Sequence, residues 1–297
     1  MPTATKFFGY SAHNLGPLTT TYTAPSSCAT SNDDHILYAN ATSPYLNYVM
    51  ASSCSAKPFG DCYPSGKQWD SAGERITKGY QGTYQYFSPG IACPKGWETV
   101  GTLKHGSKSG GIDVSGALTM SATWVSEAFS RPTPLQATDF WANVLDKSET
   151  LAYCCPSGYA GDIHGFCKSS IGPLEPTNSN DPLPKYCMVY ATNGDNQFTV
   201  TDLDGVTYTN GVLSLAPLTT GLSTTTRVVA PWGDEALEGL AYATWVPAVT
   251  LIYKKEDVDG KAEESGKRDD AKGSEDKEDD ESVAPSIRRG GVVSVLG

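Results

Sequence analysis

The sequence has few basic residues, no long apolar run and no recognisable leader. Lys and Arg number 22 against 33 Asp and Glu, which gives a net charge of −11. Because nucleic-acid binding depends on clustered Lys and Arg, we expect no nucleic-acid partner. No segment reaches the ~18 consecutive apolar residues of a transmembrane helix. The first residues, MPTATKFFGYSAHN, lack the basic stretch and the ~7–15 apolar residues of a secretory signal peptide.

Motifs for nucleophilic catalysis and phosphate binding are also missing. There is no G-x-S-x-G motif, because Gly106 to Gly110 has Lys at its centre. The segment from Gly60 to Lys67 approaches a P-loop, but five residues separate its glycines and Gln68 stands where Ser or Thr would bind magnesium. We therefore interpret this segment as a turn.

Metal-binding patterns are equally absent, and we expect no metal and no cofactor. No C-x₂-C pair is present, so His164 beside the cysteines does not make a zinc knuckle. The acidic residues Asp195, Asp202 and Asp204 do not meet the EF-hand pattern. They are instead typical of a hairpin turn rich in Asp and Gly.

What the sequence does contain is an even number of cysteines, all in its first two-thirds: Cys28, Cys54, Cys62, Cys93, Cys154, Cys155, Cys167 and Cys187. This pattern predicts four disulfides and hence an oxidising, extracellular or cell-surface location. Eight cysteines allow ~105 pairings, among which we predict the local bridges Cys54–Cys62 and Cys155–Cys167. An intracellular protein with eight reduced thiols agrees better with the missing leader and stays an alternative.

Three of the cysteines begin turns of one composition, at 62–66 (CYPSG), 93–97 (CPKGW) and 155–159 (CPSGY). Proline sets φ for the second position of a turn, and glycine tolerates the positive φ that follows. We predict three turns, each fixed to the rest of the chain by its cysteine.

The remaining patterns predict a mainly β, sandwich-like fold with one or two short helices. A helix is expected over 139–153, with Asp139 as its cap. Turn residues between β-branched and aromatic stretches predict a hairpin over 198–209. Further strands are expected at 18–23, 117–125, 224–230 and 242–253.

The C-terminal part of the chain is dominated by charge. Residues 254–281 contain 13 Asp and Glu and 7 Lys and Arg. Such a segment has too little apolar surface to offset an ordering entropy of ~1–2 kcal/mol per residue. We predict one Cys-rich, mostly β domain at 1–258 and a disordered charged tail at 259–297.

A resemblance to known proteins rests on four segments, which occur in this order: LGPLTTTYTAPSSC (15–28), YFSPGIACPKGW (86–97), CCPSGY (154–159) and VPAVTLIYKKEDV (246–258). With the cysteine layout, they resemble a widespread group of uncharacterised ascomycete fungal proteins. The resemblance implies a Cys-rich ectodomain, a low-complexity stalk and a C-terminal transmembrane helix. Here the stalk is charged, and Arg288 to Gly297 looks like the start of a span cut short, so membrane attachment stays open.

The leading functional hypothesis is a non-enzymatic surface protein that contacts a cell-wall glycan or another surface protein. Trp232, in a loop-like APWGD segment, is the candidate ligand-binding aromatic, and Asn40 begins an N-glycosylation sequon. The resemblance implies no catalytic residue. The alternative, a secreted polysaccharide hydrolase, requires two facing carboxylates, for which the candidates are Asp139, Asp146, Glu149 and Asp162.

Overall fold

The strands of this chain are short and numerous, as its 30 Gly and 19 Pro favour. The computed structural model describes residues 2, 4–30, 35–40, 50–51, 57–75, 82–106, 111–120, 133–173, 185–191, 197–203, 206–215, 222–228 and 240–259. Contacts divide the chain into two units, Met1–Val258 and Asp259–Gly297. Disorder of the tail stays a prediction, because 260–297 lie outside the described residues.

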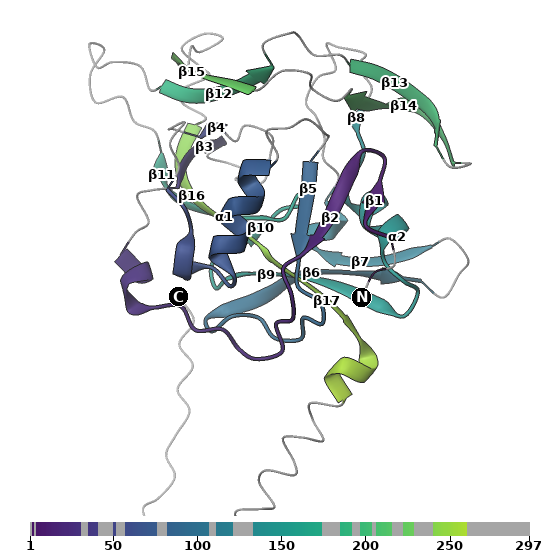
Figure 1. Cartoon of the computed structure of the whole chain (residues 1–297). Helices are drawn as coiled ribbons and strands as arrows, with labels where there is room; N and C mark the ends of the chain where they lie inside the picture. The colour runs from purple at the N-terminus through teal and green to yellow at the C-terminus, as the bar shows by residue number, and fades with distance from the viewer. Residues whose placement is uncertain are drawn as a thin grey trace, which may run out of the picture. The chain divides into compact units, whose positions relative to one another are not determined.

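The predicted mainly β fold is confirmed (Figure 1). The strands are β1 Lys6–Phe7, β2 Tyr10–Asn14, β3 Ile36–Asn40, β4 Met50–Ala51, β5 Gly82–Tyr86, β6 Trp97–His105, β7 Ile112–Gly116, β8 Thr133–Pro134, β9 Glu149–Pro156, β10 Ala160–Gly161, β11 Phe166–Pro173, β12 Lys185–Ala191, β13 Gln197–Leu203, β14 Val206–Leu215, β15 Leu222–Val228, β16 Leu240–Pro247 and β17 Val249–Lys254. The short helices are α1 Gly66–Arg75 and α2 Ala137–Val144, with 3-10 turns η1 Ser26–Thr30, η3 Gly60–Cys62 and η5 Ala117–Thr119.

These strands form five sheets, ordered β1-β2-β5, β10-β11-β16-β3-β4, β12-β15, β13-β14-β8 and β17-β9-β6-β7. Most neighbours are antiparallel, whereas the pairs β2–β5 and β14–β8 run parallel. A bridge between Phe87 and Leu251 links the end of β5 to β17. The sheet of β1, β2 and β5 is thereby joined to the sheet that contains β9.

Strand β9 connects two hydrophobic clusters because successive side chains point to opposite faces of a strand. Cys154 belongs to the smaller cluster, with Phe87 and Val249. Cys155 belongs to the main cluster, which contains Trp141 of α2. Both cysteines are fully buried. The vicinal pair thus anchors bridges on both sides of one strand.

Three disulfides join described residues: Cys28–Cys62, Cys93–Cys154 and Cys155–Cys167. The predicted Cys155–Cys167 bridge is confirmed. The predicted Cys54–Cys62 bridge is wrong, because η3 brings Cys62 to Cys28, 34 residues earlier, rather than to its nearer neighbour in sequence. Cys187 on β12 is also disulfide-bonded. Cys54 lies outside the described residues.

The three predicted turns are present. Trp97 donates its backbone N–H to Pro94 at 3.0 Å, and Tyr159 donates to Pro156 at 2.9 Å, with positive φ at Gly96 and Gly158. The first turn differs, because Ser65 takes the positive φ. Gly66 begins α1 there, and a Cβ on it would lie 1.7 Å from the carbonyl oxygen of Gly60.

The predicted helix over 139–153 is wrong at both ends. The helix expected over 139–153 stops at Val144, and Asp146 to Ser148 turn the chain into β9. Gln136, not Asp139, occupies the N-cap position. The segment TLAYCC that follows pairs with β6 and β17, so sheet pairing overrides helix propensity there.

Other strand predictions have mixed outcomes. The expected hairpin over 198–209 is confirmed by the antiparallel pair β13 and β14. The strand expected at 18–23 is wrong, since only Leu18 forms an isolated bridge, with Gly90. The strand expected from Ala117 begins instead with η5. In the described part of the chain, no helix is long and apolar enough to cross a membrane.

Candidate functional site

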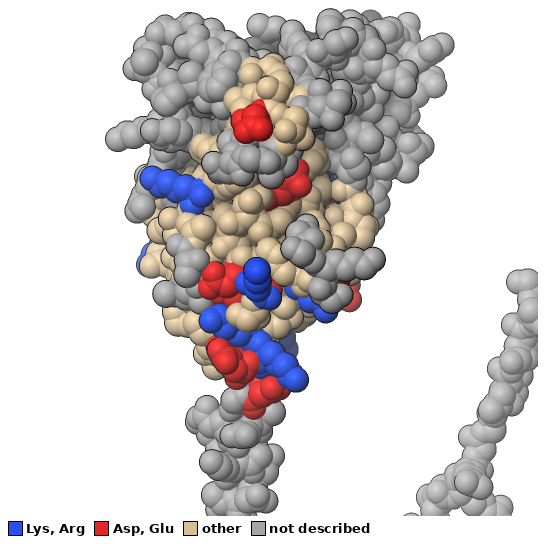
Figure 2. Space-filling model, turned by 90° about the vertical axis from the view of Figure 1, so that its right-hand side faces the viewer, with Lys and Arg blue, Asp and Glu red and all other residues tan. Residues whose placement is uncertain are grey.

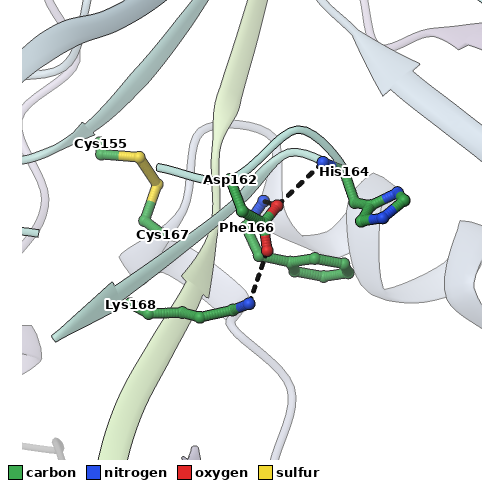
Figure 3. Close-up of polar contacts among 6 residues, drawn as sticks. All are labelled: Cys155, Asp162, His164, Phe166, Cys167 and Lys168. Carbon is green, nitrogen blue, oxygen red and sulfur yellow. Dashed lines mark hydrogen bonds and ion pairs between the residues drawn. A yellow bond between two sulfur atoms is a disulfide. The ribbon is translucent and has the colours of Figure 1, made fainter. Parts of the chain in front are cut away.

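The turn between β10 and β11 is organised by one carboxylate. Oδ1 of Asp162 accepts the backbone N–H groups of His164 at 2.9 Å and Phe166 at 3.0 Å (Figure 3). The backbone N–H of Asp162 donates to the carbonyl of Phe166 at 2.8 Å. These bonds fix where the side chains of His164 and Phe166 leave the backbone.

The same carboxylate forms a buried ion pair. Nζ of Lys168 lies 2.6 Å from Oδ2 of Asp162, and the two side chains are 3% and 6% exposed (Figure 3). Removing two charges from water is costly, and their close contact offsets that cost only while both partners are present. The pair therefore holds β11 against its preceding turn and leaves no net charge there.

A row of four aromatic rings continues from this turn across the five-stranded sheet. Phe166, on β11, contacts Trp245 of β16 edge to face, with ring centroids 5.4 Å apart. Trp245 contacts Phe59 at 5.6 Å in a similar geometry. Phe59 stacks on His35 at 4.1 Å with an interplanar angle of 12°. We call Phe166, Trp245, Phe59 and His35 the aromatic row.

Strand register and a backbone hydrogen bond hold members of the aromatic row in place. Lys168 lies directly opposite Trp245, and Phe166 opposite Pro247, in the antiparallel β11–β16 pair. The backbone N–H of Trp245 donates to the carbonyl of His35 at 3.1 Å. Phe166 is 37% exposed, whereas the other three rings are half-buried. The row therefore has one end open to solvent.

On one face of the molecule, the charged side chains of the described residues are not gathered into a patch of one sign (Figure 2). Figure 2 shows one face of the molecule, on which Lys and Arg lie beside Asp and Glu and most described atoms are uncharged. Such a face provides no extended field to attract a charged polymer.

His164 lies at the solvent-facing end of the β10–β11 turn. Neighbouring protein atoms lower the pKa of its imidazole below the ordinary value, because they replace part of the water that would stabilise the charged form. Asp162 raises this pKa and Lys168 lowers it, so the two partners of the ion pair act on it in opposite directions. We expect His164 to be neutral at pH 7.

The four carboxylates considered for hydrolysis have separate surroundings. Asp162 is engaged in the ion pair. Glu149 is buried, and its Oε2 accepts the backbone N–H of Asp146 at 2.9 Å, which closes the turn between α2 and β9. Asp139 lies in the first turn of α2, where burial raises its pKa. The structure brings Asp146 and Glu149 together through a backbone contact.

The other predicted site residues are only partly described. Trp232 lies outside the described residues. Asn40 ends β3 and pairs with Leu240, which does not test its glycosylation. Of the three aspartates examined for calcium, only Asp202 is described, and it accepts a hydrogen bond from Thr207 at 3.4 Å. Among described residues, no group of three or more His, Cys, Asp or Glu could hold a metal ion.

Sequence reasoning missed both the ion pair and the aromatic row. Lys168 follows Cys167 within a strand, and nothing in the local pattern marks it as buried. Phe59 and Trp245 are 186 positions apart in the sequence and meet only in the folded chain. The spacing of Asp162 and Lys168 around a Gly-containing turn is the one signal that predicts a hairpin contact.

Comparisons with known proteins add no relative to this picture. No family model matches the chain, nor does any curated protein or any solved structure. The resemblance to ascomycete surface proteins therefore stays a prediction.

Proposed function

We propose that this chain is a disulfide-stabilised extracellular or cell-surface module that binds a neutral polysaccharide of a cell wall, without catalysis, through the aromatic row. The observation that carries the proposal is the open end of this row at Phe166, 37% exposed beside Trp245. Sugar rings have apolar faces, and aromatic rings with an apolar body suit contact with them.

The surroundings of the row favour an uncharged ligand. The Asp162–Lys168 pair beneath it has both charges matched, and its side chains are buried. A ligand that rests on Phe166 therefore meets no net charge from the turn. The same pair limits motion of the turn, so little conformational entropy is lost when the ring is covered.

The disulfides support the location. Three bridges among described residues are compatible with an extracellular protein, because such bonds persist in oxidising compartments. Two of them tie the turns at 93–97 and 155–159 to β9 and β11, the strand that carries Phe166.

A depletion assay with insoluble β-1,3-glucan tests the proposal. We expect the purified chain to be removed from solution by the polysaccharide, and Phe166→Ala to bind about tenfold more weakly, a loss of about 1.4 kcal/mol. Ile171→Ala is the matched control, because Ile171 is an apolar residue of the same strand, 57% exposed. It should bind like the unmodified chain.

Two outcomes would contradict the proposal. Equal binding by Phe166→Ala and the unmodified chain would remove the aromatic row from the interaction. Release of new reducing ends from the polysaccharide during the assay would favour the secreted hydrolase instead. Thermal unfolding of both variants, followed in parallel, separates loss of binding from loss of structure.

A further inference from the structure

The contacts of the aromatic row do not end at Phe59. The ring of Phe59 is also parallel to that of Trp69 on α1, with an interplanar angle of 5° and ring centroids 6.4 Å apart. At this distance two rings are offset rather than overlaid, so neither covers the whole face of the other. Aromatic surface therefore continues from β11 and β16 onto α1.

Phe59 and Trp69 both rest on one buried ring. Tyr63 is 4% exposed, and its ring centroid lies 6.2 Å from that of Phe59 and 5.7 Å from that of Trp69. With the 6.4 Å between Phe59 and Trp69, the three centroids form a nearly equilateral triangle. Tyr63 is its buried corner, whereas the other two rings are half-buried. Phe59 and Trp69 thus lie side by side on the outer side of Tyr63.

Trp69 presents apolar surface to solvent. The residue as a whole is half-buried, but its Nε1 is fully covered. The part of the indole that solvent reaches is therefore ring carbon, which suits contact with the apolar face of a sugar. Lys67, Gln68 and Ser71 of the same helix are exposed, so this stretch of α1 lies at the surface.

The carboxylate next to Trp69 fixes the position of this ring relative to Phe59. Oδ1 of Asp70 accepts the backbone N–H of Phe59, and Oδ2 accepts that of Gly60, both at 2.9 Å. These two bonds join α1 to the segment that carries Phe59. Because both rings are held in place before a ligand arrives, little conformational entropy is lost when they are covered.

We propose that the glycan-binding site extends to Trp69, and that its ligand is a linear glycan of several neutral sugar units that contacts Phe166 at one end and Trp69 at the other. These two residues are joined by three ring-to-ring steps of 5.4, 5.6 and 6.4 Å, through the middle rings of the aromatic row. This inference rests on the proposed function, because it requires a neutral polysaccharide to bind at Phe166.

A site of this kind selects its ligand by length. Each further sugar that reaches a ring removes more apolar surface from water. Affinity should therefore rise until the glycan spans the distance from Phe166 to Trp69, and it should change little beyond that length. A disaccharide covers one end only, and we expect it to occupy the more open end at Phe166.

The test is calorimetric titration of the full chain with laminaribiose and laminarihexaose, the disaccharide and the hexasaccharide of β-1,3-linked glucose. We expect the hexasaccharide to bind about tenfold more tightly, a difference of about 1.4 kcal/mol. Trp69→Leu should weaken binding of the hexasaccharide about tenfold and leave that of the disaccharide unchanged. Leucine keeps an apolar contact with Tyr63 but lacks the flat ring. Phe166→Ala should weaken binding of both sugars.

The control variants separate a lost contact from a lost structure. Gln68→Ala changes an exposed neighbour of Trp69 on α1 and should bind both sugars like the unmodified chain. Trp69→Met is a second apolar replacement in case leucine disturbs packing on Tyr63. Thermal unfolding of each variant shows whether it is folded at the temperature of the titration.

The outcomes distinguish this inference from the proposed function. Equal affinity for the two sugars, or an unchanged preference for the hexasaccharide in Trp69→Leu and Trp69→Met, would overturn the inference. Binding of insoluble glucan through Phe166 would still stand in that case. Binding of neither the insoluble glucan nor the two oligosaccharides would overturn both.

Discussion

Replacing one partner of the Asp162–Lys168 ion pair should destabilise the fold far more than replacing both. Lys168→Met keeps the length of the side chain but leaves the Asp162 carboxylate buried without its counter-charge. Because the two side chains are only 3% and 6% exposed, the loss should resemble that of other broken buried pairs, about 3–5 kcal/mol. At ~2–4 °C per kcal/mol for a domain of this size, the melting temperature should fall by roughly 6–20 °C.

The compensating variant isolates the pair from its neighbours. In Asp162→Asn the carbonyl oxygen can still accept the N–H groups of His164 and Phe166. The double variant Asp162→Asn/Lys168→Met then lacks only the charges, and we expect its free energy of unfolding to lie within about 1–2 kcal/mol of the unmodified chain. Asp162→Asn alone should be much less stable, because Lys168 remains charged and buried.

Urea unfolding followed by tryptophan fluorescence measures all four proteins at pH 7. The m-values should agree, since a change in m would indicate a different denatured state. A loss below about 1 kcal/mol for Lys168→Met would match an exposed pair and refute the buried geometry. Additive losses in the double variant would refute the coupling.

Three more predictions concern single features. Under mild reduction of the native chain, Cys155–Cys167 should open last, because both of its cysteines are fully buried whereas Cys93 and Cys28 are only half-buried. Alkylation and peptide mapping would show the order, and early opening of Cys155–Cys167 would contradict the prediction. Because the pKa of His164 is lowered in the folded state, the folded chain should lose stability as the pH falls below ~6.5, the pKa of histidine in the unfolded chain. The free energy of unfolding, measured at pH 7.5 and at pH 5, should fall less for His164→Gln than for the unmodified chain. Gly66→Ala should lower the free energy of unfolding in urea by more than about 2 kcal/mol, since its Cβ would lie 1.7 Å from the carbonyl oxygen of Gly60. Gly172→Ala is the control, because the space around Gly172 is open, and an equal loss in this variant would contradict the steric explanation.

Local structure could be predicted from the sequence where a few adjacent residues determine it. The Cys-Pro-Gly turns and the hairpin of β13 and β14 follow from turn residues, and the Cys155–Cys167 bridge spans only 12 residues. The strand expected at 18–23 fails for the converse reason. Its β-branched residues favour an extended chain, but apart from the single bridge at Leu18 the described structure provides no neighbouring strand for them.

Features that depend on pairing between segments far apart in the chain could not be predicted from the sequence. The helix expected over 139–153 ends early because Glu149 to Pro156 gain partners on both sides, in β6 and β17. Cys62 meets Cys28 rather than Cys54 through the placement of η3. Strand register places Lys168 opposite Trp245 and Phe166 opposite Pro247, and register is not encoded within any one segment.

The Cys93–Cys154 bridge closes a covalent ring around everything between those two residues, including β6, β7 and α2. A single protease cut anywhere in that interval leaves two polypeptides that stay attached to each other through sulfur. Such a nicked molecule would migrate as one band on a non-reducing gel and separate only after reduction. For a protein exposed to secreted proteases, damage inside this ring need not release either piece from the fold.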